Sequence, residues 1–334
     1  MVYIVCPANL YTGGPTLLHQ LCSSLNTMGV EALMAYYPVN DSVEQHPGYA
    51  KMQVPYVQLG QIAGSFDGWV ILPETYTKGI DAFKRAHIVL WWLSVDNYVF
   101  DHLTLAQRVV KKTTDKKDPY RYFDFEKDRR RAEFSDGRIL HLVQSYYAKD
   151  FLLRAGVDSA KIKYLSDYLD DVFSVAASRE RTLSKQDIVL YNPKKMGKIT
   201  NELLRMDVSY ELKPIQNMTP DQVREAMMNA KVYIDFGGHP GMDRMPREAA
   251  ACGCCVITGK RGAAANEVDV PIPARYKFDD NGDARDVSKE IERICENYYE
   301  ARADFETYRR DILSEKEKFQ SDLKSVVNEW KIGR

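Results

Sequence analysis

Short apolar runs rich in β-branched residues alternate with segments of helical periodicity along most of this chain. Continuous apolar runs of this length are typical of strands that are buried on both faces of a parallel sheet, and the helical segments supply the crossovers between them. The alternation occurs in two series, which predicts an α/β protein with two doubly wound, Rossmann-like sheets. The first series comprises residues 2–6, 30–37, 69–74, 87–95 and 139–145, and the second comprises 187–192, 209–215, 231–236 and 254–259.

The boundary between the two series falls near residues 166–185, where an acidic connector follows a helix and a short strand. A chain of 334 residues is long enough for two domains of ordinary size. We therefore expect an N-terminal domain over 1–170 with a charged excursion over 101–138, and a C-terminal domain over 171–315. The remaining residues, 316–334, are expected to form a helix that packs against the first domain or against a second subunit, so the sequence leaves the oligomeric state open.

Charge and hydropathy restrict the possible partners. The 46 basic and 47 acidic side chains nearly cancel, so binding to nucleic acid is not expected. The first residues lack the basic and apolar regions of a signal peptide, and no later run is long enough to span a bilayer, which favours a cytoplasmic protein. The basic and aromatic residues of 108–138 form either a solvated excursion or a surface for peripheral contact with the inner face of the membrane.

Several familiar motifs are absent or incomplete. The six cysteines show no repeated spacing, which is typical of reduced thiols. Cys252 and Cys255 have metal-ligand spacing, but no second Cys or His pair lies at a useful distance, so no zinc site is predicted. The sequence lacks G-x-G-x-x-G, and GCCVITGKR departs from a P-loop in its spacing and its last residue. Nicotinamide enzymes, kinases and ATPases are therefore disfavoured.

The stretch after the strand at 231–236 has the composition of a phosphate site. Ligands of parallel α/β sheets bind at the carboxyl ends of the strands. Here the strand ends in a glycine-rich turn that includes Gly241, and a helix is expected to start near 245–246. The unpaired amides of that helix and the positive end of its dipole, together with Arg244 and Arg247, are suited to a phosphate.

Glu248 is expected one turn into this helix. At that distance its carboxylate can accept hydrogen bonds from ribose hydroxyls without meeting the phosphate charge directly, so these residues outline a nucleotide site. A simpler interpretation is that Arg244 and Glu248 form an ordinary ion pair on the helix surface.

Residues 231–267 resemble the donor site of GT-B glycosyltransferases of the kind that build bacterial capsules and lipopolysaccharides (glycosyl transferases group 1-like). A strand, a polar glycine loop, a helix with a glutamate, an Ala-Cys-Gly turn, a second strand and a glycine-rich loop before another glutamate occur in the family's order. The segment LVQSYYAKDFLLRAGV also resembles the end of the first domain in many such enzymes, with Ser145 and Tyr146 at the familiar position. The resemblance extends over most of the chain and implies the GT-B fold, with two Rossmann-like domains that face each other across a cleft.

The resemblance also implies a nucleotide-sugar-dependent hexosyltransferase. Its donor, a nucleoside diphosphate sugar, is expected in the second domain, and a glycan or lipid-linked acceptor of surface polysaccharide or related glycan synthesis is expected in the first. Glu248 is implied to bind the ribose, one of the lysines at 194, 195 and 198 the diphosphate, and the loop at 12–14 the transferred sugar or its phosphates. Among the lysines we favour Lys198. The residues inferred to bind the donor are Gly13, Gly14, Lys194, Lys198, Gly241, Arg244, Arg247, Glu248 and Glu267.

Two departures from the family concern the reacting carbon. Many retaining members carry two glutamates eight positions apart, and the place of the first is Pro240 here, beside His239. Relatives also often carry a histidine after the strand at 87–95, where this chain has Ser94 and Asp96. We take Asp96, Ser94 and His239 as catalytic candidates. If Asp96 deprotonates an acceptor hydroxyl, the reaction is an inverting displacement, although an aspartate at this place can equally cap the next helix.

No cofactor and no metal are predicted. The reason is that no D-x-D pair ends a strand, and that lysines, arginines and the helix dipole can offset the charge of a diphosphate. Because a fold does not fix a reaction, a nucleotide-sugar epimerase or a glycan phosphorylase on the same fold is an alternative. A third hypothesis is a catalytically silent partner that binds a nucleotide or glycan, since the first glutamate and the histidine are missing.

Overall fold

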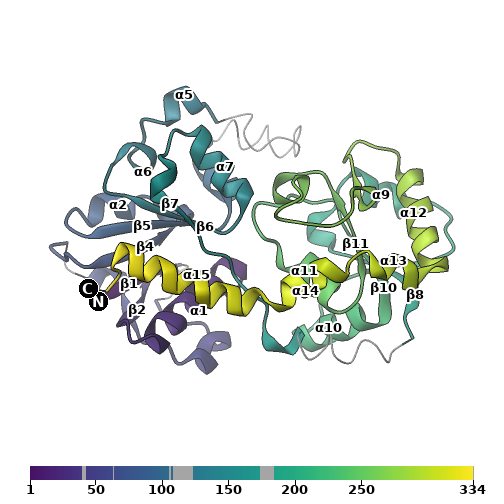
Figure 1. Ribbon diagram of the computed structural model, residues 1–334, viewed down its shortest axis with the longest axis horizontal. Coiled ribbons are helices and arrows are strands. Elements are labelled where there is room, and N and C mark those ends of the chain that lie inside the picture. Colours follow the sequence, from purple (N-terminus) through teal and green to yellow (C-terminus); the bar gives the residue numbers. More distant parts are fainter. Residues whose placement is uncertain (40–42, 63, 105–106, 108–122, 174–183, 334) are drawn as a thin grey trace. The chain divides into compact units, whose positions relative to one another are not determined.

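The computed structural model describes residues 1–333 apart from 40–42, 63, 105–106, 108–122 and 174–183. The chain divides into two compact units, which we describe separately (Figure 1). Unit 1 comprises Met1–Asp167 and Lys318–Arg334, and unit 2 comprises Tyr168–Glu317. Residues 105–106 and 108–122 of the predicted charged excursion lie outside the described residues.

Unit 1 is built on a seven-stranded sheet whose strand pairs are all parallel. The order β3-β2-β1-β4-β5-β6-β7 shows that the chain runs from β1 to one edge of the sheet and then, from β4 onward, to the other edge. The strands are β1 (Val2–Pro7), β2 (Ala32–Tyr37), β3 (Tyr56–Gln58), β4 (Trp69–Pro73), β5 (His87–Trp92), β6 (Leu140–Val143) and β7 (Ile162–Tyr164).

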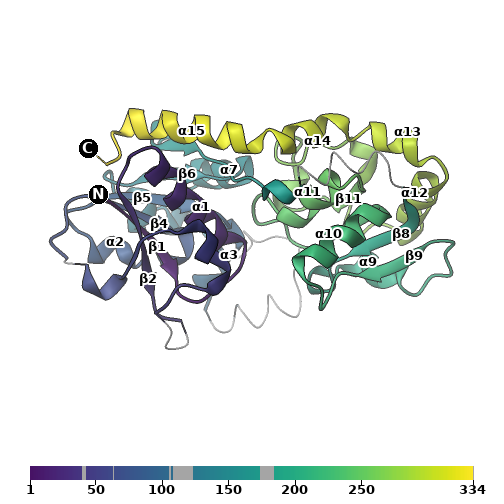
Figure 2. The same ribbon diagram turned by 90° about the horizontal axis from the view of Figure 1, so that it is seen from below.

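Helices and short 3₁₀ segments connect these strands. The C-terminal helix α15 lies beside α1, because Gln320 donates a hydrogen bond to the hydroxyl of Ser24 at 3.1 Å (Figure 2). Lys163, which lies in β7, pairs with Glu329 of α15 at 2.6 Å. The α-helices are α1 (Gly13–Thr27), α2 (Gly79–Ala82), α3 (Val95–Asp101), α5 (Phe125–Asp128), α6 (Ala132–Ser135), α7 (Tyr146–Arg154) and α15 (Glu315–Trp330), and the 3₁₀ segments are η1 (Pro47–Met52), η2 (Leu59–Gln61), η3 (Glu74–Tyr76) and η5 (Ser159–Lys161).

Unit 2 is built on a five-stranded sheet, again with parallel pairs only, in the order β12-β11-β10-β8-β9. The strands are β8 (Gln186–Tyr191), β9 (Glu211–Pro214), β10 (Ala230–Asp235), β11 (Cys255–Gly259) and β12 (Lys277–Phe278). The α-helices are α9 (Lys198–Leu203), α10 (Pro220–Asn229), α11 (Arg244–Ala251), α12 (Ala284–Glu296), α13 (Tyr298–Ala303) and α14 (Glu306–Leu313), and the 3₁₀ segments are η6 (Pro193–Lys195), η7 (Gly262–Ala265) and η8 (Ala274–Tyr276).

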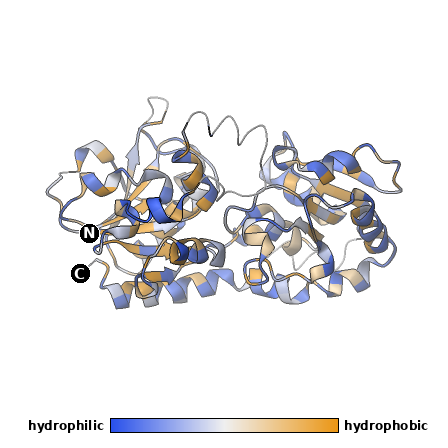
Figure 3. Cartoon of the chain, turned by 90° about the horizontal axis from the view of Figure 1, so that it is seen from above, coloured by the Kyte–Doolittle hydropathy of each residue, from blue (hydrophilic) through white to orange (hydrophobic). Residues whose placement is uncertain are grey.

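Each unit has its own hydrophobic core, with hydrophobic residues gathered on its strands (Figure 3). The core of unit 2 includes Cys252 and Cys255, and burial raises the pKa of both thiols to about 12. Thiols held in their neutral form inside a core pack as small apolar groups and react slowly. No helix in the described part of the chain combines the length and the apolar character that a bilayer span requires.

The α/β class and the two Rossmann-like sheets predicted from the sequence are confirmed, because every predicted apolar run contributes a strand. The edge strands β3 and β12 are not among those runs, since they contain only three and two residues and carry no period of their own. Helix α11 begins at Arg244, one residue before the predicted start at 245–246.

Candidate functional site

The carboxyl ends of β8 and β10 mark the point at which the strand order of the second sheet reverses. Strands β9 and β10 lie on opposite sides of β8, and ligands of open α/β sheets bind at such a point. The loop after β8 carries Lys195, and the loop after β10 spans residues 236–243. These loops approach so closely that a Cβ atom on Gly237 would lie 2.6 Å from the Cβ of Lys195. Only glycine fits at this position.

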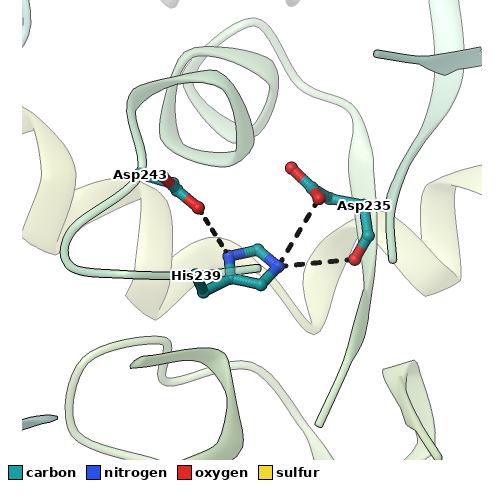
Figure 4. A group of neighbouring side chains, drawn as sticks. All are labelled: Asp235, His239 and Asp243. Carbon is teal, nitrogen blue, oxygen red and sulfur yellow. Dashed lines mark hydrogen bonds and ion pairs between the residues drawn. The ribbon is translucent and has the colours of Figure 1, made fainter. Parts of the chain in front are cut away.

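Four charged side chains meet between these loops, and three of them, Asp235, His239 and Asp243, are drawn in Figure 4. The imidazole of His239 lies between two carboxylates, with Nδ1 3.0 Å from Oδ2 of Asp243 and Nε2 3.6 Å from Oδ1 of Asp235. The Nζ of Lys195 lies 2.6 Å from Oδ2 of Asp243 and donates a hydrogen bond to the carbonyl of Gly238 at 3.2 Å. This ion network, Asp235, His239, Asp243 and Lys195, joins the loop after β8 to the loop after β10.

Burial and charge act on His239 in opposite directions. Burial disfavours the charged imidazole, but the carboxylates of Asp235 and Asp243 outweigh burial, and the pKa of His239 is raised. Burial also disfavours the charged form of Asp243, yet its contacts with His239 and Lys195 hold the pKa of this carboxyl below its usual value. Within the network the carboxylates thus favour the charged imidazole, and His239 and Lys195 favour the charged form of Asp243.

Asp235, His239 and Asp243 also meet the first requirement of a metal site, because one donor atom from each lies within 4.8 Å of the other two. Their geometry favours ion pairing instead. The two carboxylates face different nitrogens of the ring (Figure 4), and one ion can bind only one of these nitrogens. Lys195 already supplies a positive charge 2.6 Å from Asp243. We therefore interpret the cluster as a structural ion network.

Helix α11 begins directly after this network. Its N-cap residue is Asp243, and the side chain of Asp243 makes no capping hydrogen bond because its carboxylate faces His239 and Lys195. The first amides of α11 consequently lack a side-chain cap at the positive end of the helix dipole. A helix start of this kind is suited to an anion.

Arg244 and Glu248 lie in the first turns of α11 and form an ion pair, with Nε of Arg244 3.4 Å from Oε1 of Glu248. The same guanidinium lies 3.4 Å from Oδ2 of Asp170. Its Nη1 is buried and has no hydrogen-bond partner among the described residues. Burial raises the pKa of Glu248, against the effect of Arg244. A guanidinium with an unused donor, followed by a carboxylate one turn later, matches the pattern that a phosphate and a ribose require.

Arg247 uses its donors within the protein. Its side chain is 1% exposed, and Nη1 donates to Oε2 of Glu315 at 2.8 Å. Nε and Nη2 donate to the carbonyls of Asp243 and Met242 at 3.2 and 3.0 Å. These contacts support the loop before α11 from inside.

The other predicted donor residues of unit 2 lie on neighbouring loops. Lys194 is exposed in η6, and Gly241 is buried in the loop after β10. Lys198 is the first residue of α9, and its Nζ lies 3.6 Å from Oε1 of Glu202. Glu267 is exposed after η7, and η7 is joined to the loop after β10 by the hydrogen bond from the amide of Ala263 to the carbonyl of His239.

Two of the predicted donor residues belong to unit 1. Gly13 and Gly14 form the first turn of α1 and follow the loop at the carboxyl end of β1. The N-cap residue Thr12 makes no side-chain capping bond. A Cβ on Gly14 would lie 3.7 Å from Leu93, an ordinary contact, so packing alone does not demand glycine there.

Ser94 and Asp96 occupy the start of α3. The hydroxyl of Ser94 accepts a hydrogen bond from the amide of Asn97 at 3.2 Å, so Ser94 caps this helix. Asp96 lies in the first turn and accepts a hydrogen bond from the hydroxyl of Tyr147 at 3.0 Å. The capping role that the sequence allowed for Asp96 is therefore filled by Ser94.

Sequence reasoning missed two buried acids that end strands. Asp235 ends β10, and Glu74 directly follows β4. Glu74 accepts a hydrogen bond from the amide of Leu93 at 3.0 Å, and burial raises the pKa of Glu74 to about 7. Each acid stands at the carboxyl end of an apolar run, which is the signal that identifies the ligand-binding edge of a parallel sheet.

Comparisons with known proteins place this architecture among solved structures. No protein family and no curated protein matches the sequence. The structure is similar to Anabaena Alr3699/HepE, solved in complex with UDP-glucose, at 13% identity over 98% of this chain and 99% of that chain, with a TM-score of 0.64. The chain has the GT-B fold. Sucrose-phosphate synthase from Thermosynechococcus elongatus matches at 12% identity over 100% and 99% of the two chains, with a TM-score of 0.65.

A third similar structure is WaaG, a glycosyltransferase involved in lipopolysaccharide biosynthesis. It is 10% identical, covers 97% of this chain and 99% of its own, and gives a TM-score of 0.57. These matches extend over nearly the whole chain, so the GT-B fold implied by the sequence resemblance is confirmed. At such low identities these matches establish the fold and not the function.

Proposed function

We propose that this GT-B chain is a nucleotide-sugar-dependent glycosyltransferase whose donor binds at the start of α11. The observation that carries the proposal is the order of groups there: helix amides without a side-chain cap, Arg244 with a donor that has no partner among the described residues, and Glu248 one turn later. This arrangement stands at the strand-order reversal of the second sheet. Support also comes from Alr3699/HepE, a protein of the same fold that was solved with UDP-glucose and with UDP and glucose.

In this proposal the diphosphate accepts hydrogen bonds from the first amides of α11 and from Arg244, and the ribose hydroxyls donate to Glu248. Gly241 lets the backbone approach the phosphates. Lys194 and Lys198, on the loop and helix after β8, add positive charge from the neighbouring strand end. These cations and the helix dipole offset the diphosphate charge, so we propose that transfer needs no metal.

For the chemical step we propose that Asp96 in unit 1 takes the proton of an acceptor hydroxyl. The hydroxyl oxygen then forms a bond to the anomeric carbon while the bond from that carbon to the diphosphate breaks, and the nucleoside diphosphate leaves with the electron pair. The product has inverted configuration. We further propose a glycan or lipid-linked acceptor in surface polysaccharide or related glycan synthesis, and a cytoplasmic site of action with peripheral contact at the membrane.

Calorimetric titration with a panel of nucleoside diphosphates and nucleotide sugars tests the donor site. Wild-type protein should bind at least one member, and Glu248→Ala should weaken that binding by roughly tenfold or more, because it loses charge-assisted hydrogen bonds worth about 1.5–3 kcal/mol. Glu225→Ala, an exposed change on α10 of the same unit, serves as the matched control and should bind like wild type. Equal binding by Glu248→Ala and Glu225→Ala, or no binding by wild type, refutes the assignment of the donor site to the start of α11.

A further inference from the structure

The loop between β1 and α1 exposes two large hydrophobic side chains in succession. Leu10 is 39% exposed and Tyr11 is 52% exposed. The loop, residues 8–12, follows the carboxyl end of β1, where the strand order of the first sheet reverses between β1 and β4. A lone exposed aromatic needs no explanation, but this one stands at the place where such sheets bind ligands.

Tyr11 is also held in a defined position. Its ring stacks on His46 with centroids 5.2 Å apart and lies 5.0 Å from the ring of Tyr49. A Cβ on Gly48 would lie 2.6 Å from Cε2 of Tyr11, so the missing side chain of Gly48 provides the space for the ring. The exposed ring of Tyr11 therefore packs against Gly48 and Tyr49 of the 3₁₀ segment η1.

Within η1, Tyr49 is the buried residue, and its contacts hold it in place. Tyr49 is 1% exposed, and its hydroxyl donates a hydrogen bond to the carbonyl of Leu10 at 3.3 Å. The ring of Tyr49 stacks on His19 at 3.7 Å, and His19 lies 2.6 Å from both the carbonyl of Pro15 and the hydroxyl of Tyr36. Burial lowers the pKa of His19 to about 4, so this histidine is neutral at physiological pH. The layer beneath Tyr11 and Tyr49 therefore carries no charge from His19.

We propose that Tyr11 is a sugar-binding platform whose ring packs against the apolar C–H face of an uncharged pyranose in the acceptor. A ring fixed before binding loses little side-chain freedom when the ligand arrives, which favours binding by an otherwise exposed aromatic. A neutral ligand with one apolar face suits an exposed ring that lies against buried Tyr49, whose pKa burial raises to about 12 so that it stays uncharged. The inference rests on the proposed function, which assigns a sugar-containing acceptor to unit 1.

Saturation-transfer NMR with the methyl glycosides of glucose, galactose, mannose and N-acetylglucosamine tests the platform. Wild-type protein should transfer saturation to the ring protons of at least one of these pyranosides. Tyr11→Ala should weaken that binding by roughly three- to tenfold, whereas Tyr11→Phe should keep it, because the ring supplies the contact. Gly48→Val, which displaces the ring without removing it, should also weaken binding.

Tyr56→Ala is the matched control, since Tyr56 lies in the same unit, is 49% exposed, and belongs to β3 instead of the loop. Equal transfer from wild type and from Tyr11→Ala, or no transfer from wild type to any of the four pyranosides, overturns the proposal. The nucleotide titration separates this failure from failure of the proposed function. Loss of pyranoside binding with intact nucleotide binding removes only the platform, and the opposite result leaves a sugar-binding surface on a protein without the proposed donor site.

Discussion

Replacement of Glu74 by glutamine should change the pH dependence of the stability of unit 1. Glu74 is 3% exposed, and its carboxylate accepts a hydrogen bond from the amide of Leu93 at 3.0 Å. Burial nevertheless dominates and raises the pKa of Glu74 from 4.5 to about 7. Glutamine keeps the shape and an oxygen acceptor for Leu93 but cannot ionise. The variant therefore separates the cost of a buried charge from the value of the hydrogen bond.

The magnitude follows from proton linkage. Between the unfolded pKa of 4.5 and the folded pKa of about 7, the unfolded chain has released the proton and the folded chain retains it, so the free energy of unfolding falls as pH rises. A difference of about 2.5 pKa units corresponds to about 3 kcal/mol. The decrease in the free energy of unfolding should be complete above about pH 7. Glu74→Gln lacks this pH-dependent contribution to stability. Any constant cost of burying the amide cancels when the pH dependence of the free energy of unfolding is compared between wild type and variant.

Urea unfolding followed by tryptophan fluorescence is the appropriate assay. The four tryptophans, at 69, 91, 92 and 330, all belong to unit 1, so the signal reports the unit that contains Glu74. From about pH 5 to about pH 8, wild-type protein should lose about 3 kcal/mol of stability relative to Glu74→Gln. Glu31→Gln, an exposed change, should follow wild type. Parallel pH profiles for wild type and Glu74→Gln would refute the reasoning.

Two further substitutions test the remaining candidates. His239→Gln removes the cation between Asp235 and Asp243 and should destabilise unit 2 by about 3–5 kcal/mol near pH 6, measured by circular dichroism during urea unfolding. Because the pKa of His239 is raised, wild type should lose this advantage as pH rises through that pKa, and a deficit independent of pH would contradict the ion network. Asp96→Asn should lower the rate of sugar transfer by roughly 10²–10⁴-fold with unchanged nucleotide affinity, and unchanged turnover would remove Asp96 as the base.

The fold was predictable because its signals are local. Runs such as 69–74 and 231–236 carry enough apolar and β-branched residues to identify buried parallel strands, and their repetition identifies two sheets. The short strands β3 and β12 contain only three and two residues, too few to show a period of their own. The glycine-rich turn and the helix of the candidate site were predictable for the same local reason.

The partners within the candidate site were not predictable. Asp170 approaches Arg244, and Glu315 approaches Arg247, across more than sixty positions of sequence. Nothing in the local pattern distinguishes the two arginines, yet Arg244 has a buried donor without a partner in the described part of the chain, whereas Arg247 makes its contacts inside the protein. Similarly, the place of His239 in the motif suggests a catalytic role. Only the fold shows that His239 and Lys195 both contact the carboxylate of Asp243.

At the start of α11, the contacts of Asp243 are shorter than the contact between Arg244 and Glu248. Lys195 and His239 lie 2.6 and 3.0 Å from Asp243, within the range of strong charge-assisted hydrogen bonds or close to it, and these groups anchor the loop. Arg244 and Glu248 are 3.4 Å apart, which is long for such a bond. In the proposed donor site, a phosphate that approaches Arg244 would therefore replace a weak contact, while the loop that presents the helix amides would keep its strong ones. The proposal that these residues bind a nucleotide agrees with this difference, because the ion network, and not the Arg244–Glu248 pair, anchors the loop at the helix start.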